Sequence, residues 1–530
     1  MNFQRNISAL LLLTFLLTSC ASAEATPVVF PTYDPFLPIN NGTPSQIVDV
    51  SASATPSPTI TPTREPTPTR AQVNLPPFFG ITSQIQTTPT PDPARILPTP
   101  RQDVDEYVVQ FGDTLGGIAL RYGISVQALM QANNMTDPNL LAVGQLLIIP
   151  APNPIGLGSA LKIIPDSELV YGPGSIYFDI DEFIQSQNGY LASYAEDVNG
   201  VILGGADIIE LVASNYSVNP RLLLALLEYQ SGWVTNPLPF NTSYPLGLID
   251  ESRYGLYRQL AWAANTLNRG YYSWKVNALS TFILSDGQVI PINPTINAGT
   301  VAVQYFFSQL NDLTTWQRDI HETGLILTYF VFFGNPFGYA IEPLVPTNLV
   351  QPEMNLPFRA GESWYFTGGP HGGWDAGSAW AALDFAPPNN TDGNCNVSPY
   401  WVTAMADGLI LRASDGAVAQ DLDNDGYEQT GWVILYMHIA EQDRIQSNEY
   451  IFANENIGHP SCEGGVSNAT HLHIARKYNG EWISADGSLP FILNGWVSSG
   501  DGIQYNGFLT RGSQIVEAWD SANDFNLITR

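Results

Sequence analysis

The sequence is poor in basic residues and in cysteine. Its 530 residues include 20 lysines and arginines against 49 aspartates and glutamates, so the formal net charge is -29. An acidic surface of this kind repels phosphate backbones, and we therefore expect no nucleic acid partner. Three cysteines allow one disulfide at most. The length predicts about three domains.

The start of the chain has no apolar run long enough to span a bilayer. The run from Ile7 to Leu17 follows Arg5, and a spanning helix needs about 20 residues. A charged start and a short apolar run are typical of a secretory signal. The run ends in Leu-Thr-Ser-Cys20, which resembles the lipobox of bacterial lipoproteins. This resemblance implies a signal peptide over 1–19 and a lipid anchor on Cys20, which would hold the protein on the membrane in the extracytoplasmic cell envelope. The alternative is an ordinary secretory signal with a chance cysteine.

Export also bears on the other two cysteines. The predicted lipid anchor uses Cys20, which leaves Cys395 and Cys462. A single remaining pair in an oxidising compartment predicts a disulfide between them.

Residues 20–104 have no sustained apolar period and are rich in proline, threonine and serine, as in Thr55-Pro56-Ser57-Pro58-Thr59. Such a segment cannot bury a core. Proline favours extended polyproline II structure, so we expect a semi-rigid tether that lifts the rest of the chain off the membrane. A glycosylated, mucin-like stalk is the alternative, and it would also act as a spacer.

A small module follows the tether. A short strand is predicted over Tyr107–Gln110, a helix to about Tyr122, a second helix capped by Ser125, and a closing strand over Gln145–Pro150. This β-α-α-β unit closely resembles a LysM domain and occupies residues 105–151. LysM modules bind chains of N-acetylglucosamine, so the resemblance implies that this one binds the glycan of peptidoglycan. The alternative is a degenerate module that binds nothing.

Residues 158–350 show apolar residues at helical spacing and predict a mostly α domain. The segment VNPRLLLALLEYQSGWV resembles the helix of lytic transglycosylases and goose-type lysozymes, where a catalytic glutamate directly precedes Ser-Gly. Gln230 stands at that position, and an amide cannot protonate a glycosidic oxygen. Glu228 lies two residues earlier, about 200° around the helix. We therefore predict a lysozyme-like domain without glycosidase activity, kept for structure or glycan binding, with an unrelated helical domain as the alternative.

The last third of the chain holds most of the histidines. Of six in all, five lie between His371 and His473, among glycines and short β-like runs. Residues i and i+2 of a strand share a face, so His471 and His473 should point the same way, with Leu472 in the core.

The same alternation predicts that Trp432, Tyr436 and His438 share one face of another strand. A polar set of histidine and aspartate on a packed sheet is suited to catalytic zinc, which takes three protein ligands and a water.

The histidine-containing segments, in their order along the chain, resemble the lysostaphin-type zinc endopeptidases. The resemblance covers about 360–490, and it places a mainly-β metallopeptidase domain over 351–530. It implies three Zn2+ ligands and a catalytic pair that handles protons and stabilises the oxyanion. The implied ligands are His371, Asp384 and His473, and the implied catalytic pair is His438 and His471.

The aspartate ligand has two candidates. The family often spaces its first two ligands as His-x-Gly-x-Asp, which would select Asp375. We favour Asp384, because Ala-Leu-Asp-Phe-Ala looks like the family strand and would place the carboxylate on a rigid element.

Asp421, Asp423 and Asp425 follow the D-x-D-x-D-G opening of a calcium-binding loop. The twelfth position is Trp432, where an EF-hand needs a bidentate glutamate, and Glu428 is a candidate substitute. The alternatives are a Ca2+ site and an acidic hairpin turn.

Two functions from different classes follow. The leading one is a wall-anchored zinc metalloendopeptidase that hydrolyses peptide bonds in peptidoglycan stem peptides or cross-bridges, with the LysM module holding it on the glycan. The rival is a non-catalytic wall-binding or amidase-activating lipoprotein. The filled ligand set favours the peptidase.

Overall fold

The computed structural model describes residues 95–96, 101–110, 112–154, 156–388 and 394–530. The predicted signal peptide, the Cys20 lipidation site and most of the predicted tether lie outside these residues. Within the described part of the chain, no helix has both the length and the apolar character needed to cross a bilayer.

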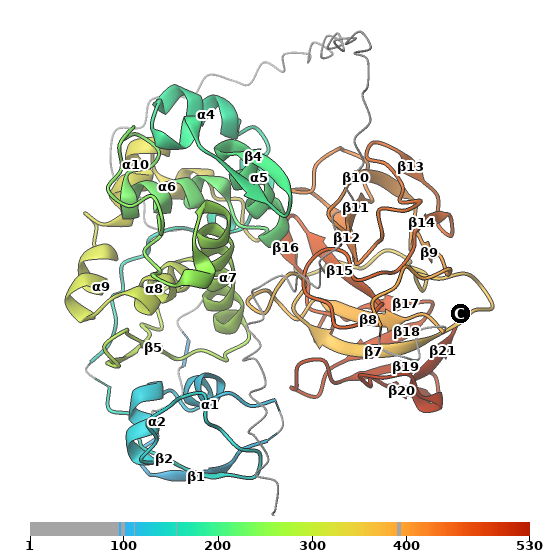
Figure 1. Ribbon diagram of the computed structural model, residues 1–530, viewed down its shortest axis with the longest axis horizontal. Helices are drawn as coiled ribbons and strands as arrows, with labels where there is room; N and C mark the ends of the chain where they lie inside the picture. Colours follow the sequence, from blue (N-terminus) through green and yellow to red (C-terminus); the bar gives the residue numbers. More distant parts are fainter. Residues whose placement is uncertain (1–94, 97–100, 111, 155, 389–393) are drawn as a thin grey trace, which may run out of the picture. The chain divides into compact units, whose positions relative to one another are not determined.

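The first folded module packs two short helices against a two-stranded antiparallel sheet (Figure 1). Ser125 caps the second helix as predicted, because its hydroxyl oxygen accepts a hydrogen bond from the amide of Ala128. Leu147 and Ile149 alternate into the apolar core of the module. Its elements are β1 (Asp105–Val108), α1 (Leu115–Arg121), α2 (Val126–Ala132) and β2 (Leu146–Ile149).

The middle of the chain is mostly helical and contains two small β-hairpins. Its helices are α3 (Asp166–Leu169), α4 (Ile180–Gln187), α5 (Gly205–Tyr216), α6 (Pro220–Ser231), α7 (Leu256–Lys275), α8 (Ala298–Leu310), α9 (Leu313–Asp319) and α10 (Leu325–Phe333). The hairpins are β3 (Ala195–Val198) with β4 (Val201–Gly204), and β5 (Thr281–Ile283) with β6 (Val289–Pro291). Short 3₁₀ turns lie at Pro173–Ser175, Tyr190–Ser193, Glu251–Arg253 and Pro336–Tyr339. We call residues 162–345 the helical domain.

Local sequence explains where the central helices begin and how they pack. Asn219 caps α6, Pro220 occupies its first position, and left-handed Gly232 ends it. Helices α7 and α8 pack closely because Gly270 has no side chain. A Cβ at that position would lie 2.8 Å from the Cα of Ala302.

In the last part of the chain, residues 351–530, the regular structure is almost entirely antiparallel strands, and we call this part the β domain. Its main sheet has the strand order β13-β10-β11-β12-β15-β8-β7-β21, with β16 paired to β15 (Figure 1). A smaller sheet has the order β17-β18-β19-β20, and β9 pairs with β14. The strands of the main sheet are β7 (Ser363–His371), β8 (Ala382–Ala386), β10 (Gly408–Ser414), β11 (Ala417–Asp421), β12 (Trp432–Met437), β13 (Tyr450–Ile451), β15 (Leu472–Tyr478), β16 (Glu481–Trp482) and β21 (Leu527–Thr529). The others are β9 (Val402–Thr403), β14 (Asn456–Gly458), β17 (Ile492–Leu493), β18 (Trp496–Ser499), β19 (Phe508–Arg511) and β20 (Gln514–Glu517), and a 3₁₀ turn lies at Asp524–Asn526.

The two faces of the main sheet are buried by different parts of the chain. Side chains of one face, such as Leu472 and Ile474, join the core of the β domain. Residues of the other face, such as Ala475 and Trp482, join the buried cluster of the helical domain. The amide of Trp482 also donates to the hydroxyl of Tyr272 on α7, at 3.0 Å. The helical domain therefore covers one face of the sheet that carries the histidines.

Candidate metal centre

Three side chains from neighbouring strands converge at one point of the main sheet. His371 ends β7, Asp384 lies in β8, and His473 lies opposite Asp384 in β15. The Nε2 of His371 is 3.0 Å from the Nδ1 of His473. The Oδ1 of Asp384 is 3.3 Å from the first of these nitrogens and 3.2 Å from the second. Gly368, across from Asp384, leaves room for this carboxylate, because a Cβ there would lie 2.5 Å from Oδ2.

Backbone carbonyls fix which nitrogen of each ring faces the centre. The Nδ1 of His371 lies 2.8 Å from the carbonyl oxygen of Gly369, and the Nε2 of His473 lies 3.1 Å from that of Gly373. A carbonyl oxygen can only accept a hydrogen bond, so these two nitrogens carry the hydrogen. In neutral rings the other two nitrogens then present lone pairs to Asp384. Burial lowers the pKa of His473, which favours the neutral ring.

Asp384 places a carboxylate oxygen opposite the inward ring nitrogens of His371 and His473. It is 8% exposed, and no described group donates a hydrogen bond to its Oδ1. Burial raises the pKa of this carboxyl, but the protonated forms of His371 and His471 outweigh burial and hold it well below its usual range. Three buried electron-pair donors at this spacing are suited to a cation. Tetrahedral zinc with ligands at about 2.0–2.1 Å separates its ligand atoms by about 3.3 Å, so the set fits zinc.

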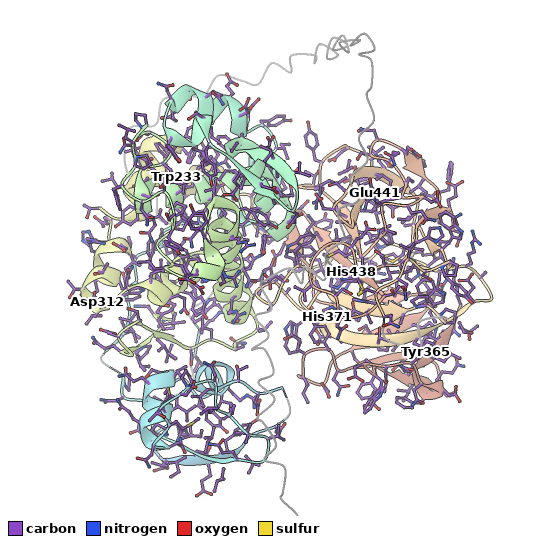
Figure 2. The ribbon with its side chains drawn as sticks, in the orientation of Figure 1. Trp233, Asp312, Tyr365, His371, His438 and Glu441 are labelled. Atoms are coloured by element: carbon purple, nitrogen blue, oxygen red, sulfur yellow. A yellow bond between two sulfur atoms is a disulfide. The ribbon has the colours of Figure 1, made fainter. Side chains whose placement is uncertain are left out.

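The other two histidines of the predicted site lie beside this set. The rings of His438 and His471 are 4.4 Å apart, and the Nε2 of His471 is 3.8 Å from the Oδ1 of Asp384. The Nδ1 of His438 donates to the carbonyl of Glu463 at 3.1 Å, and the Nδ1 of His471 donates to that of Ala469 at 2.8 Å. Each ring therefore keeps its Nε2 available for proton transfer. Figure 2 labels His371 and His438 close together in the β domain.

The predicted shared face of Tyr436 and His438 was wrong. Tyr436 is fully buried in the core of the β domain, and its hydroxyl donates to Gln420 at 2.8 Å. Strand β12 ends at Met437, and His438 has a left-handed φ of 64°. This conformation reverses the alternation and brings the ring beside His471. A non-glycine residue held in such a conformation is typical of functional sites.

Asp375, the alternative aspartate, lies outside the converging set. It sits in the loop between β7 and β8 in a left-handed conformation, with φ 61°. Its Oδ2 accepts a hydrogen bond from the hydroxyl of Tyr216 on α5, at 3.3 Å. Burial raises the pKa of this carboxyl to about 6. The three-residue group of possible metal ligands contains Asp384 and not Asp375.

A disulfide joins Cys395 to Cys462, with 5.5 Å between their Cα atoms. The chain beside Cys395 holds the residue before His471, because the amide of Asn396 donates to the hydroxyl of Thr470 at 2.8 Å. The bridge therefore ties together two loops that border the candidate centre.

The acidic loop between β11 and β12 brings Asp421, Asp423 and Asp425 within 4.8 Å of one another. Asp421 already accepts backbone amides of the loop, including that of Gly426 at 3.0 Å. Glu428 is not a substitute calcium ligand, because its carboxylate is bound by Arg412 and Lys477 on the buried side of the sheet. Calcium binding by the three aspartates stays a prediction.

One aromatic neighbour of the centre had no signal in the sequence. Tyr505 lies in the loop between β18 and β19 and stacks on the ring of His371, with the centroids 4.3 Å apart. The backbone carbonyl of Tyr505 accepts a hydrogen bond from the amide of Gly369 at 2.8 Å. A tyrosine in a polar loop far along the chain resembles many surface residues, so only the fold reveals this contact.

In the helical domain, Gln230 and Glu228 leave α6 in different directions. The side chain of Gln230 lies near Gly247, at 3.6 Å from where a Cβ of that residue would be. The carboxylate of Glu228 instead accepts from the amides of Val234 and Thr235, at 3.0 and 3.1 Å. Glu228 therefore stabilises the turn after α6.

The first two folded parts of the chain match models of known protein families. Residues 107–150 match the model of the LysM domain, and residues 162–345 match the model of the LasA N-terminal domain. Protease LasA of Pseudomonas aeruginosa is 24% identical over 372 residues, which cover 65% of this chain and 81% of LasA.

Two solved structures are also similar to the chain. The metalloprotease pseudoalterin, from deep-sea, is 22% identical, with 33% of this chain and 99% of that chain covered and a TM-score of 0.25. The catalytic domain of the antimicrobial peptidase lysostaphin, from Staphylococcus simulans, is 24% identical, with 23% and 88% covered and a TM-score of 0.17.

The chain pairs a LysM domain with parts that are similar in sequence to protease LasA. The predictions of a multidomain chain, of its LysM domain and of a mainly-β last part are therefore confirmed. The middle part matches a domain of LasA, and its predicted likeness to lysozyme stays a prediction.

Proposed function

We propose that the chain is a zinc metalloendopeptidase that hydrolyses peptide bonds in peptidoglycan. One observation carries the proposal: ring nitrogens of His371 and His473 and a carboxylate oxygen of Asp384 meet at one buried point, and the Oδ1 of Asp384 has no hydrogen-bond partner among the described residues. The similarity to protease LasA supports a peptidase, and the LysM domain supports a cell-wall substrate.

The chemistry divides between the ligands and the second histidine pair. A zinc ion at this point would supply Lewis acidity, which polarises a carbonyl oxygen and lowers the pKa of water. His438 and His471 present their Nε2 atoms to the same space. One of them accepts the proton of the attacking water, hydrogen bonds in its protonated form with the tetrahedral oxyanion, and then passes the proton to the leaving amine. Burial and the neighbouring rings of His471 and His473 lower the pKa of His438 well below its usual range, so it starts neutral.

We also propose how the enzyme is held near its substrate. The LysM domain would bind glycan strands and raise the local concentration of the attached peptides. A lipid on Cys20 would keep the protein on the membrane, in the extracytoplasmic cell envelope.

The test is to incubate the full-length chain with purified cell walls and identify the released fragments by mass spectrometry. Peptides cut within stem peptides or cross-bridges are expected, together with one zinc per chain by elemental analysis. Intact walls and a metal-free protein would instead support the non-catalytic wall-binding or amidase-activating role.

A further inference from the structure

The loop at residues 372–380 connects the first two proposed zinc ligands and contacts the third. It runs from the end of β7, at His371, to the start of β8. Its Gly373 carbonyl accepts the hydrogen bond from the Nε2 of His473, at 3.1 Å. Because that bond sets the tautomer and orientation of the ring, the position of the loop determines how His473 presents its Nδ1.

The helical domain holds this loop past its middle, at Gly377. The amide of Gly377 donates to the Oδ1 of Asn265 on α7, at 2.6 Å, and Asn265 is 2% exposed. The contact is tight, since a Cβ on Gly377 would lie 2.0 Å from the carbonyl oxygen of Asn265. Any residue with a side chain at position 377 would therefore clash with α7, so the close approach of the loop to the helix requires glycine there.

A second anchor holds the near end of the loop. A Cβ on Gly373 would lie 2.6 Å from the ring of Trp482, so the loop backbone rests directly on that ring. The ring in turn donates its Nε1 hydrogen to the carbonyl of Tyr216 on α5, at 3.3 Å. The hydroxyl of Tyr216 also donates to Asp375, within the loop. The loop is therefore held by the helical domain directly at Gly377 and Asp375, and through Trp482 at Gly373.

Hydrogen bonds within the loop also couple the position of Gly377 to that of Gly373. The amide of Gly373 donates to the carbonyl of Ala379 at 3.0 Å, and the hydroxyl of Ser378 accepts from the amide of Trp374 and donates to the carbonyl of Asp375. These bonds close the loop on itself, so a shift at Gly377 moves the Gly373 carbonyl as well.

We infer that the helical domain sets the zinc affinity of the β domain through this loop, with Asn265 as a positioning residue. The inference rests on the proposed zinc site. It gives the helical domain a role that needs no glycan binding and no chemistry of its own. The residue acts on His473 only through the Gly377 amide and the Gly373 carbonyl.

The experiment uses the full-length chain and two variants of the contact, Asn265→Ala and Gly377→Ala. The matched controls are Asn311→Ala, which removes a 2.8 Å hydrogen bond to Asp319 elsewhere in the helical domain, and Gly338→Ala, where a Cβ meets nothing within 4 Å. Zinc affinity is measured by competition with a chromogenic chelator at pH 7. Circular dichroism of the metal-free proteins confirms that each is folded at the temperature used.

Both contact variants should bind zinc about tenfold more weakly than the wild type, and both controls should bind it as the wild type does. Loss of folding in Gly377→Ala leaves the decision to Asn265→Ala, which adds no atoms. Wild-type affinity in a folded Asn265→Ala variant would overturn this inference alone. A wild-type chain that binds no zinc would overturn the proposed function as well, so the two failures are distinguishable.

Discussion

At the scale of single residues, backbone carbonyls separate the histidines into two kinds. His371 and His473 donate to carbonyls that turn their other nitrogen toward Asp384. His438 and His471 donate to carbonyls that leave their Nε2 beside the set, where His471 stays 3.8 Å from Asp384. The first kind is placed to bind a metal and the second to move protons. This division gives two separate predictions.

His473→Ala removes one of the three proposed ligands. We expect the variant to lose its zinc, because two ligands no longer enclose the ion, and to lose wall lysis with it. Lewis acid catalysis contributes several kcal/mol, so activity should fall by about a thousandfold or more. Elemental analysis and turbidity of a cell-wall suspension measure the two effects. A variant with full activity, or a wild type that stays active after exhaustive chelation, would contradict the assignment.

His471→Ala should instead retain the zinc and lose turnover. General acid–base catalysis contributes about 10²- to 10⁴-fold, and the loss should fall in that range. The zinc content of the purified variant and its rate of peptide release are the measurements. Should the variant arrive without metal, the ligand and proton-transfer roles of His471 and His473 would be reversed.

The side chains that meet at the centre could be predicted from the sequence. The backbone carbonyls that orient the histidine rings could not. Alternation along a strand is enough to place His471 and His473 on one face. It failed for His438, because a left-handed residue at a strand end does not follow that rule. The carbonyls of Gly369 and Gly373 leave no trace in the sequence, since every residue has a carbonyl.

At the scale of elements, local sequence accounts for α6, from the Asn219 cap to the left-handed Gly232 that ends it. The formation of the helix does not decide whether it is catalytic, because glycosidase activity would depend on the residue at position 230, near its end. Gln230 stands where the predicted likeness to lytic transglycosylases places the catalytic acid, and the carboxylate of Glu228 accepts hydrogen bonds from the turn at Val234 and Thr235.

We therefore predict no glycosidase activity in the helical domain. The test uses the full-length His473→Ala variant, so that peptidase activity does not interfere and the helical domain keeps the sheet against which it packs. Incubation with purified glycan strands should release no new reducing ends and no anhydro-sugars. Either product would show that a carboxylate does serve as the acid, and Glu228→Gln would then be the first variant to examine.

At the scale of the whole molecule, the helical domain and the β domain share one buried cluster. Sequence reasoning treated them as separate domains, because an apolar helix face looks the same whether it packs on another helix or on a sheet. The side of the sheet that meets the helices also carries charge. The guanidinium of Arg412 and the ammonium of Lys477 both bind Glu428, and Arg412 also donates to Asn215 on α5.

This buried charge cluster predicts how stability depends on pH. Burial alone would raise the pKa of Glu428, but Arg412 and Lys477 outweigh it and lower the pKa from 4.5 to about 2. A carboxyl whose pKa is depressed in the folded state stabilises the fold above its unfolded pKa, and that contribution is lost as the pH falls through the folded value. The window here runs from about pH 4.5 down to about pH 2, and the contribution at neutral pH is about 3 kcal/mol.

Glu428→Gln should therefore destabilise the protein by about 3 kcal/mol at pH 7, because it leaves two buried cations without their carboxylate. The difference from the wild type should shrink at pH 3, because Glu428 is then protonated in the unfolded wild type while it is still largely ionised in the folded protein. Urea unfolding followed by tryptophan fluorescence at both pH values measures this difference. Glu441→Gln, at an exposed position of the same domain, is the matched control and should change stability little at either pH. A Glu428→Gln deficit that is the same at pH 7 and pH 3 would mean that the variant acts through packing and that the charge cluster does not stabilise the contact between helices and sheet.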